Sequence, residues 1–134
     1  MYNYQINGSA RDNRDSELKE LFHDVGWVRP NRDWNRLNRA IRKSATVVSV
    51  RDNNNKLIGL CSALDDGLNV VITYLLVASE HQGLNIGSTL LDIIREHYCV
   101  HRITVMTEKA EGFYSKNGFL KISTGLEFDS TNEQ

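Results

Sequence analysis

The sequence lacks most of the features that would assign it to a special environment. It has one proline in 134 residues, and no apolar run approaches the ~20 residues that cross a bilayer. The polar start of the chain does not resemble a signal peptide, so we predict a cytoplasmic protein. The formal net charge is −1, which excludes a strong overall attraction to nucleic acid or to membranes.

Cysteine is also scarce, and two residues cannot build a disulfide framework. Cys61 and Cys99 lie in apolar segments, which indicates buried free thiols, although the sequence leaves a bridge open. His97 and His101 do not share one helical face with Cys99, because the helix should end before His101. This spacing matches no zinc site, and we expect no metal.

The chain does have the length of one domain and an alternation of strand and helix patterns. We find no linker and no internal repeat, so residues 1–134 are predicted to form a single domain. Strand patterns are present at residues 4–6, 45–50, 57–64, 70–77, 103–105 and 119–128. Two helical patterns separate the first two strands, and one more follows each of the fourth and fifth. This order predicts an α/β domain with an antiparallel first half and a parallel crossover in the second.

The most informative segment joins the strand at 70–77 to an amphipathic helix. This strand has little polar alternation, so we expect it to be central and covered on both faces. In the following loop, Gly83 and Gly87 permit close approach of the backbone to a ligand, and Asn85 tolerates a positive φ. The free N–H groups at the start of a helix can bind phosphate. The segment therefore predicts an anion site, with an ordinary strand–turn–helix junction as the alternative.

Two motifs lie on either side of the strand at 103–105. They are Gln82-Gly-Leu-Asn-Ile-Gly87 and Ala110-Glu-Gly-Phe-Tyr-Ser-Lys-Asn-Gly-Phe119. They resemble the Arg/Gln-x-x-Gly-x-Gly/Ala and Ala-x-x-Phe-Tyr-x-x-x-Gly-Phe segments of the GNAT superfamily of acetyl-CoA-dependent N-acetyltransferases. Asn85 stands where that family usually has glycine, and Thr107 where it often has asparagine. The second departure puts one side-chain contact to the cofactor in doubt.

The resemblance implies a GNAT-like mixed sheet of six to seven strands, with about four helices on its two faces. It implies an enzyme that moves an acetyl group from acetyl-CoA, its co-substrate, to a primary amine of a small molecule or peptide. The amine would attack directly, without an acetylated enzyme. Catalysis would then depend mostly on orientation and on stabilisation of charge.

The same resemblance implies the residues that would bind acetyl-CoA. Backbone groups of Leu75, Leu76 and Val77 would bond the pantetheine arm in the manner of a neighbouring strand. The diphosphate would lie on the N–H groups of Gln82, Gly83, Leu84, Asn85, Ile86, Gly87 and Ser88. Thr107 and Phe113 are further candidates for the cofactor site, although core packing is favoured for Phe113.

Tyr114 is our candidate for the general acid, because a tyrosine hydroxyl stays protonated at neutral pH and can donate to the departing thiolate. Packing in the core is the alternative role. We name no general base: the place where some relatives carry a glutamate is Val71. Water-mediated catalysis by Asp65, Asp66, Tyr74 or Glu108, or deprotonation of the amine by solvent, remain open.

The substrate candidates are Trp27 and Tyr74. Trp27 and Trp34 could each line an apolar or cationic acceptor pocket, and core packing is the alternative for both. The missing strand carboxylate and Thr107 also permit a non-catalytic acyl-CoA-binding sensor or regulatory module. The arginines at 32, 36 and 39 suggest a nucleic-acid substrate, but a solvated helix face is favoured, and we expect no nucleic-acid partner. Exposed sheet edges make a homodimer a further prediction.

Overall fold

The computed structural model describes residues 1–13, 16–26 and 34–130 of the chain. The strands are β1 (Asn3–Ile6), β2 (Thr46–Arg51), β3 (Leu57–Asp65), β4 (Asn69–Val77) and β5 (Arg102–Val105). The helices are α1 (Ser9–Asp12), α2 (Glu17–Asp24), α3 (Trp34–Arg42), the short 3₁₀ helix η1 (Ser79–His81), α4 (Ile86–His97) and α5 (Glu111–Lys116). None of the described helices is both long enough and apolar enough to cross a membrane.

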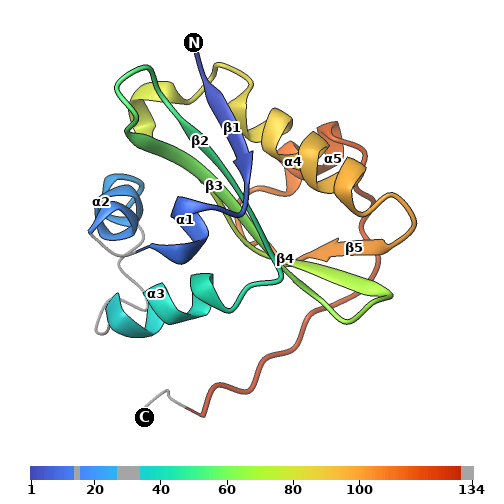
Figure 1. Cartoon of the computed structure of the whole chain (residues 1–134). Coiled ribbons are helices and arrows are strands. Elements are labelled where there is room, and N and C mark those ends of the chain that lie inside the picture. Colours follow the sequence, from blue (N-terminus) through green and yellow to red (C-terminus); the bar gives the residue numbers. More distant parts are fainter. Residues whose placement is uncertain (14–15, 27–33, 131–134) are drawn as a thin grey trace.

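The five strands form one mixed sheet in the order β1-β2-β3-β4-β5. Neighbours are antiparallel from β1 to β4, whereas β5 lies parallel to β4 because α4 forms the crossover between them. Helices α1, α2 and α3 cover one face of the sheet, and α4 and α5 cover the other (Figure 1). The prediction of an α/β domain with a parallel crossover in its second half is therefore confirmed.

Each face of the sheet buries its own apolar cluster. On the α4 side, the helix places Ile86, Leu90 and Ile94 against the sheet at the spacing that the sequence predicted. On the other side, Phe22 of α2 and Leu37 of α3 are buried against the sheet. These two layers hold the strands rigidly enough to position a site at their ends.

The predicted place of β4 in the sheet was only partly right. The strand is second from the edge, and β3 is the middle strand. Its buried residues include Val70 and Ile72, but the Val71 side chain is 39% exposed on the face of α1–α3. The neighbouring Leu64 is exposed on that face too, because α2 and α3 pack over β2, β3 and the far half of β4. An apolar strand pattern therefore did not mean cover on both faces.

The number of strands is a second correction. We predicted six to seven, but the described residues form five, because the segment 119–128 is not a strand. Residues 120–128 make no hydrogen bond that would add them to the sheet. The described residues also form a fifth α-helix, α1, which is too short to show a helical period in the sequence.

The cysteine prediction holds for one residue of the two. Cys61 is fully buried in β3, and burial raises the pKa of its thiol to about 12. Cys99 is exposed, which contradicts the predicted burial, because it follows the end of α4. Both thiols are free.

Candidate active site

The central feature of the site is an unequal pairing of β4 with its two neighbours. Along β3 the pairing extends from Val70 to Val77, the full apolar part of the strand. Along β5 it stops at Ile72, which pairs with Val105. Among the described residues, no strand pairs with residues 73–77 on the β5 side. The backbone there faces a gap between two parallel strands.

A β-bulge lies where the gap begins. In the pairing of β3 with β4, Ser62 is opposite Tyr74 and Ala63 is opposite Ile72, so Thr73 is an extra residue in β4. The bulge is held by side chains, since the Ser62 and Thr73 hydroxyl oxygens are 2.8 Å apart. A bulge bends a strand and increases its twist, and this one directly follows Ile72, which pairs with Val105, the last residue of β5.

The gap leads to six main-chain N–H groups at the start of α4. None of the N–H groups of residues 83–88 donates a hydrogen bond to any described residue. The first intrahelical bond is donated by the Thr89 N–H to the Asn85 carbonyl oxygen. Because the first turn of α4 contains no acidic residue, nothing within it neutralises the positive end of the helix. The arrangement suits a bound diphosphate.

Two left-handed residues give this loop its shape. Gly83 has a φ of 82°, and Asn85, the residue before α4, has a φ of 68°. The prediction that Asn85 can replace the usual glycine is confirmed in its backbone conformation. The Asn85 side chain does not cap the helix, so it leaves the N–H groups accessible.

Gln82 links the loop back to β4. Its side-chain amide donates to the Val77 carbonyl oxygen at 2.9 Å, at the end of the unpaired part of the strand. This bond fixes the start of the loop relative to β4. The side chain is therefore already engaged, whereas the Gln82 N–H donates only a long bond of 3.4 Å to the Ser79 carbonyl oxygen.

Gly87 and Phe113 join the two motifs in space. A Cβ atom added at Gly87 would lie 3.2 Å from Cζ of Phe113, tighter than nearly all such contacts in proteins. The absence of a side chain at Gly87 therefore lets α5 pack against α4. Phe113 is partly buried in the core on that side, in agreement with the core packing that we favoured for it.

Tyr114 is buried on the same side of the sheet, with 8% of its surface exposed. Its ring contacts the rings of Phe113 and Phe119, with centroids 5.2 and 5.4 Å away. Burial, together with the nearby Cys61 thiol, raises the pKa of Tyr114 to about 12. The hydroxyl thus stays protonated over the whole physiological range, as a proton donor requires.

The opposite side of β4 carries a cluster of rings. Tyr74 lies with its ring centroid 5.4 Å from that of Phe22, which in turn lies 6.4 Å from Trp34. Burial raises the pKa of Tyr74, which is about half-buried. The sequence predicted a helical core face for Phe22, and either an acceptor pocket or the core for Trp34. It did not predict the contact with Tyr74, which depends on how α2 and α3 dock. The other substrate candidate, Trp27, lies outside the described residues.

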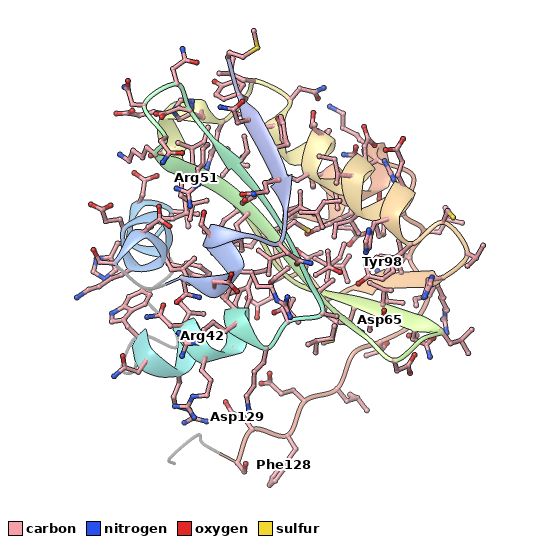
Figure 2. All side chains as sticks on the ribbon, viewed as in Figure 1. Arg42, Arg51, Asp65, Tyr98, Phe128 and Asp129 are labelled. Atoms are coloured by element: carbon pink, nitrogen blue, oxygen red, sulfur yellow. The ribbon has the colours of Figure 1, made fainter. Side chains whose placement is uncertain are left out.

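Of the candidate bases, Asp65 and Asp66 lie away from the gap, whereas Tyr74 is in the part of β4 that β5 does not pair. Asp66 accepts the N–H groups of Leu68 and Asn69, which lowers its pKa and fixes the turn before β4. That turn is at the opposite end of β4 from the gap (Asp65 is labelled in Figure 2). Thr107 accepts the Ala110 N–H, so its side chain shapes the approach to α5.

Possible metal ligands do not gather within the described residues. There, no group of three or more His, Cys, Asp or Glu side chains could hold an ion. His81 bonds the Tyr2 hydroxyl, and His101 lies 3.8 Å from Asp65. His81 and His101 are thus each positioned beside another side chain rather than beside each other.

Comparisons with known proteins agree with this geometry. The sequence profile of the acetyltransferase (GNAT) domain matches residues 43–121, more than half of the chain. The chain belongs to the GNAT acetyltransferase family. This GNAT protein is accordingly a transferase of the acyltransferase class. Its family typically uses acetyl-CoA, and membership implies a substrate that accepts the acetyl group.

Solved structures match the GNAT chain over nearly its whole length. A GNAT family acetyltransferase from Streptococcus pneumoniae is 22% identical, with 98% of this chain and 100% of that chain covered and a TM-score of 0.79. A probable acetyltransferase from Staphylococcus aureus is 17% identical, with coverages of 96% and 99% and a TM-score of 0.80. Glucosamine-6-phosphate N-acetyltransferase from Arabidopsis thaliana is 16% identical, with coverages of 96% and 99% and a TM-score of 0.68. At these identities, the TM-scores show a shared fold. No curated protein matches the chain.

Proposed function

We propose that this protein transfers an acetyl group from acetyl-CoA to a primary amine of a small molecule or peptide. The observation that carries the proposal is the row of six unbonded N–H groups at residues 83–88, at the end of the open side of β4. A diphosphate on this row would place the rest of a long, strand-like ligand along residues 73–77. Bound acetyl-CoA supplies the activated acetyl group.

The backbone of β4 would hold the pantetheine arm. Leu75, Leu76 and Val77 lie in the part of the strand that β5 does not pair. An extended ligand with amide groups can bond such an edge as an added strand does. One N–H of this edge would also polarise the thioester carbonyl and stabilise the negative charge that develops on its oxygen.

Tyr114 would act as the general acid. The amine attacks the carbonyl carbon, a C–N bond forms, and the C–S bond breaks as the thiolate leaves. The Tyr114 hydroxyl would donate a proton or a hydrogen bond to that sulfur. The Tyr114 hydroxyl is protonated at neutral pH and can therefore donate. The amine would lose its own proton to solvent.

The acceptor amine would approach from the side of Tyr74. This residue lies on the face of the sheet opposite Tyr114, beside Phe22 and Trp34. Aromatic side chains attract an amine cation or pack against an apolar group, and either property would suit an acceptor pocket.

The proposal is tested in two steps with the full chain. Isothermal calorimetry with coenzyme A should give saturable binding that weakens as salt is added, since a diphosphate carries charge. Release of free thiol from acetyl-CoA should then depend on one or more primary amines in a panel. No heat of binding from a folded sample would remove the cofactor assignment. Binding without amine-dependent thiol release would favour the sensor module.

A further inference from the structure

The last residue of α2 carries a charge that its own helix disfavours. Asp24 lies at the C-terminal end of α2, where the helix dipole is negative and a carboxylate is unfavourable. The carboxylate is bonded instead to Ser79, which is 55 positions further along the chain and is the first residue of η1. The acid is therefore explained by its contact with another element and not by α2.

Asp24 supplies the cap that η1 lacks. Its Oδ2 accepts the Ser79 N–H at 2.6 Å, and the Ser79 hydroxyl donates to the carboxylate, with Oδ1 and Oδ2 at 3.1 and 2.9 Å. Ala78, the residue before η1, has no side-chain acceptor for this N–H. The bond from the N–H, and then that from the hydroxyl, lower the pKa of Asp24. The carboxylate is therefore charged at neutral pH, and such bonds are stronger than bonds between neutral groups.

Of the two elements in this contact, α2 is fixed by packing and η1 is not. Leu18, Leu21 and Phe22 of α2 are buried against the sheet. None of the three residues of η1 is buried. A bond of 2.9 Å between the His81 ring and the Tyr2 hydroxyl holds the last residue of η1. The position of η1 therefore depends on bonds to its side chains and backbone, and Asp24 provides those at its first residue.

This short helix separates the two parts of the candidate site. The open edge of β4, residues 73–77, lies just before it, and the unbonded N–H groups of residues 83–88 lie just after it. A shift of η1 would change the distance between the edge and the loop. One ligand that binds both parts needs that distance to be fixed in advance, because affinity falls with the fraction of molecules in the competent conformation.

We propose that Asp24 is a positioning residue of the cofactor site, which holds η1 against α2 and so fixes the loop at 83–88 relative to the open edge of β4. The inference rests on the proposed function, since coenzyme A is the ligand that would span both parts. Asp24 acts through Ser79 and not through contact with the ligand.

The sign of the effect separates positioning from charge. A carboxylate near a diphosphate repels it, so charge alone predicts that removal of Asp24 tightens the binding of coenzyme A. Positioning predicts that removal weakens it. Asparagine at this place has no charge but keeps a side-chain oxygen that can accept the Ser79 N–H. The two effects are thus separable at one residue.

The first experiment measures coenzyme A affinity by calorimetry on the full chain. Asp24→Ala should weaken binding about fivefold, as expected if the loop is then in its binding position about a fifth of the time. Asp24→Asn should stay within about twofold of the wild type, because it keeps the cap. Ser79→Ala, which loses only the hydroxyl, should have a smaller effect than Asp24→Ala and add nothing to it in the double variant.

Asp66→Ala is the matched control. Asp66 is also exposed and accepts main-chain N–H groups, those of Leu68 and Asn69, but in the turn at the other end of β4. This variant should bind coenzyme A as the wild type does. Circular dichroism checks that every variant is folded at the temperature of the titration.

The second experiment uses turnover with an amine that the panel identifies. Asp24→Ala should raise the KM for acetyl-CoA about fivefold and change neither kcat nor the KM for the amine, because the buried residues of α2 stay in place. A general loss of structure would change all three. If the wild type binds coenzyme A and Asp24→Ala binds it equally well or more tightly, this inference alone is wrong. A folded wild type that does not bind coenzyme A overturns the proposed function as well.

Discussion

The two sides of β4 differ in how much of their backbone is hydrogen-bonded to a neighbouring strand. That difference distinguishes the supporting part of the sheet from the candidate site. Toward β3, backbone bonds hold the strand along its whole apolar length. Toward β5, they hold only residues 69–72. Beyond that point lie the free edge of residues 73–77 and the unbonded N–H groups of residues 83–88. A sheet whose backbone is fully paired cannot offer main-chain groups to a ligand.

A bulge lies at the boundary between the part of β4 that β5 pairs and the part that it does not. Thr73 is inserted where β4 leaves β5, and its hydroxyl is bonded to Ser62 on the paired side. The polar side chain at the bulge therefore has its hydrogen-bond partner in β3, on the paired side of β4. The site then contains few side chains with special chemistry, so substitutions on the two sides of β4 should have different consequences.

The largest effect is expected for Tyr114→Phe, because the hydroxyl that it removes is our candidate for the general acid. We expect kcat to fall about 10²-fold or more, the range for loss of a general acid. The melting temperature should change little, since the ring still packs on Phe113 and Phe119. Thiol release at saturating acetyl-CoA and amine measures kcat.

Tyr98→Phe is the matched control for that substitution. The Tyr98 hydroxyl bonds Thr46 inside the scaffold, so its loss should lower stability by about 1 kcal/mol and leave kcat unchanged. If both variants, or neither, lower kcat, the division between the two sides of β4 fails and Tyr114 is not the acid.

A tenfold effect is expected at Asn85, where the open side ends. Valine is β-branched and strained at a φ of 68°, at a cost of about 1–2 kcal/mol, so Asn85→Val should weaken binding of coenzyme A about tenfold. Asn85→Gly keeps the conformation and should bind at least as well as the wild type. Calorimetry compares the three proteins, and equal affinities would show that the loop shape does not control binding.

A smaller effect, with opposite signs on two measurements, is expected for Ser88→Asp. The new carboxylate lies in the first turn of α4, where it stabilises the free protein by about 0.3–1 kcal/mol and raises its melting temperature. The same charge should repel a diphosphate and weaken binding of coenzyme A several-fold at low salt. Ser88→Asn, which is similar in shape and uncharged, should do neither. A variant that binds more tightly would place the phosphates elsewhere.

The last effect concerns the paired side and is the smallest at neutral pH, where it vanishes. The pKa of the Cys61 thiol is raised from about 9 to about 12 by burial, so the folded state holds its proton more tightly than the unfolded state. Stability is therefore complete below pH 9 and is lost between pH 9 and 12, by at most about 1.4 kcal/mol per pH unit. Urea unfolding gives the free energy of unfolding at several pH values. Between pH 9 and 12 this free energy should fall less steeply with pH for Cys61→Ala than for the wild type. Equal slopes would mean that the thiol does not titrate on unfolding.

The site was predictable from the sequence where it depends on local geometry. The glycines, Asn85 and the apolar stripe of α4 lie within a few residues of each other, and their conformations follow from steric rules and helical spacing. The left-handed Gly118 after α5 is a similar case. The positions of Leu75 to Val77 on an unpaired edge depend on where β5 ends, and no local pattern encodes that.

The failed predictions all concern cover by distant parts of the chain. The segment 119–128 has a strand pattern, yet a strand forms only where a second edge is within reach. Val71 has the composition of a buried residue, but its exposure depends on how far α2 and α3 extend over the sheet. The predicted burial of Cys99 was wrong for the same reason, because no other part of the described chain covers it.

The order of strands and helices and the left-handed backbone of Gly83 and Asn85 were determined by the sequence itself, because each depends on neighbouring residues. The gap beside β4, the contact of Tyr74 with Phe22 and the open edge at β5 were decided only by the tertiary structure. Backbone pairing and burial depend on residues far apart in the chain, and these meet only when the layers have packed.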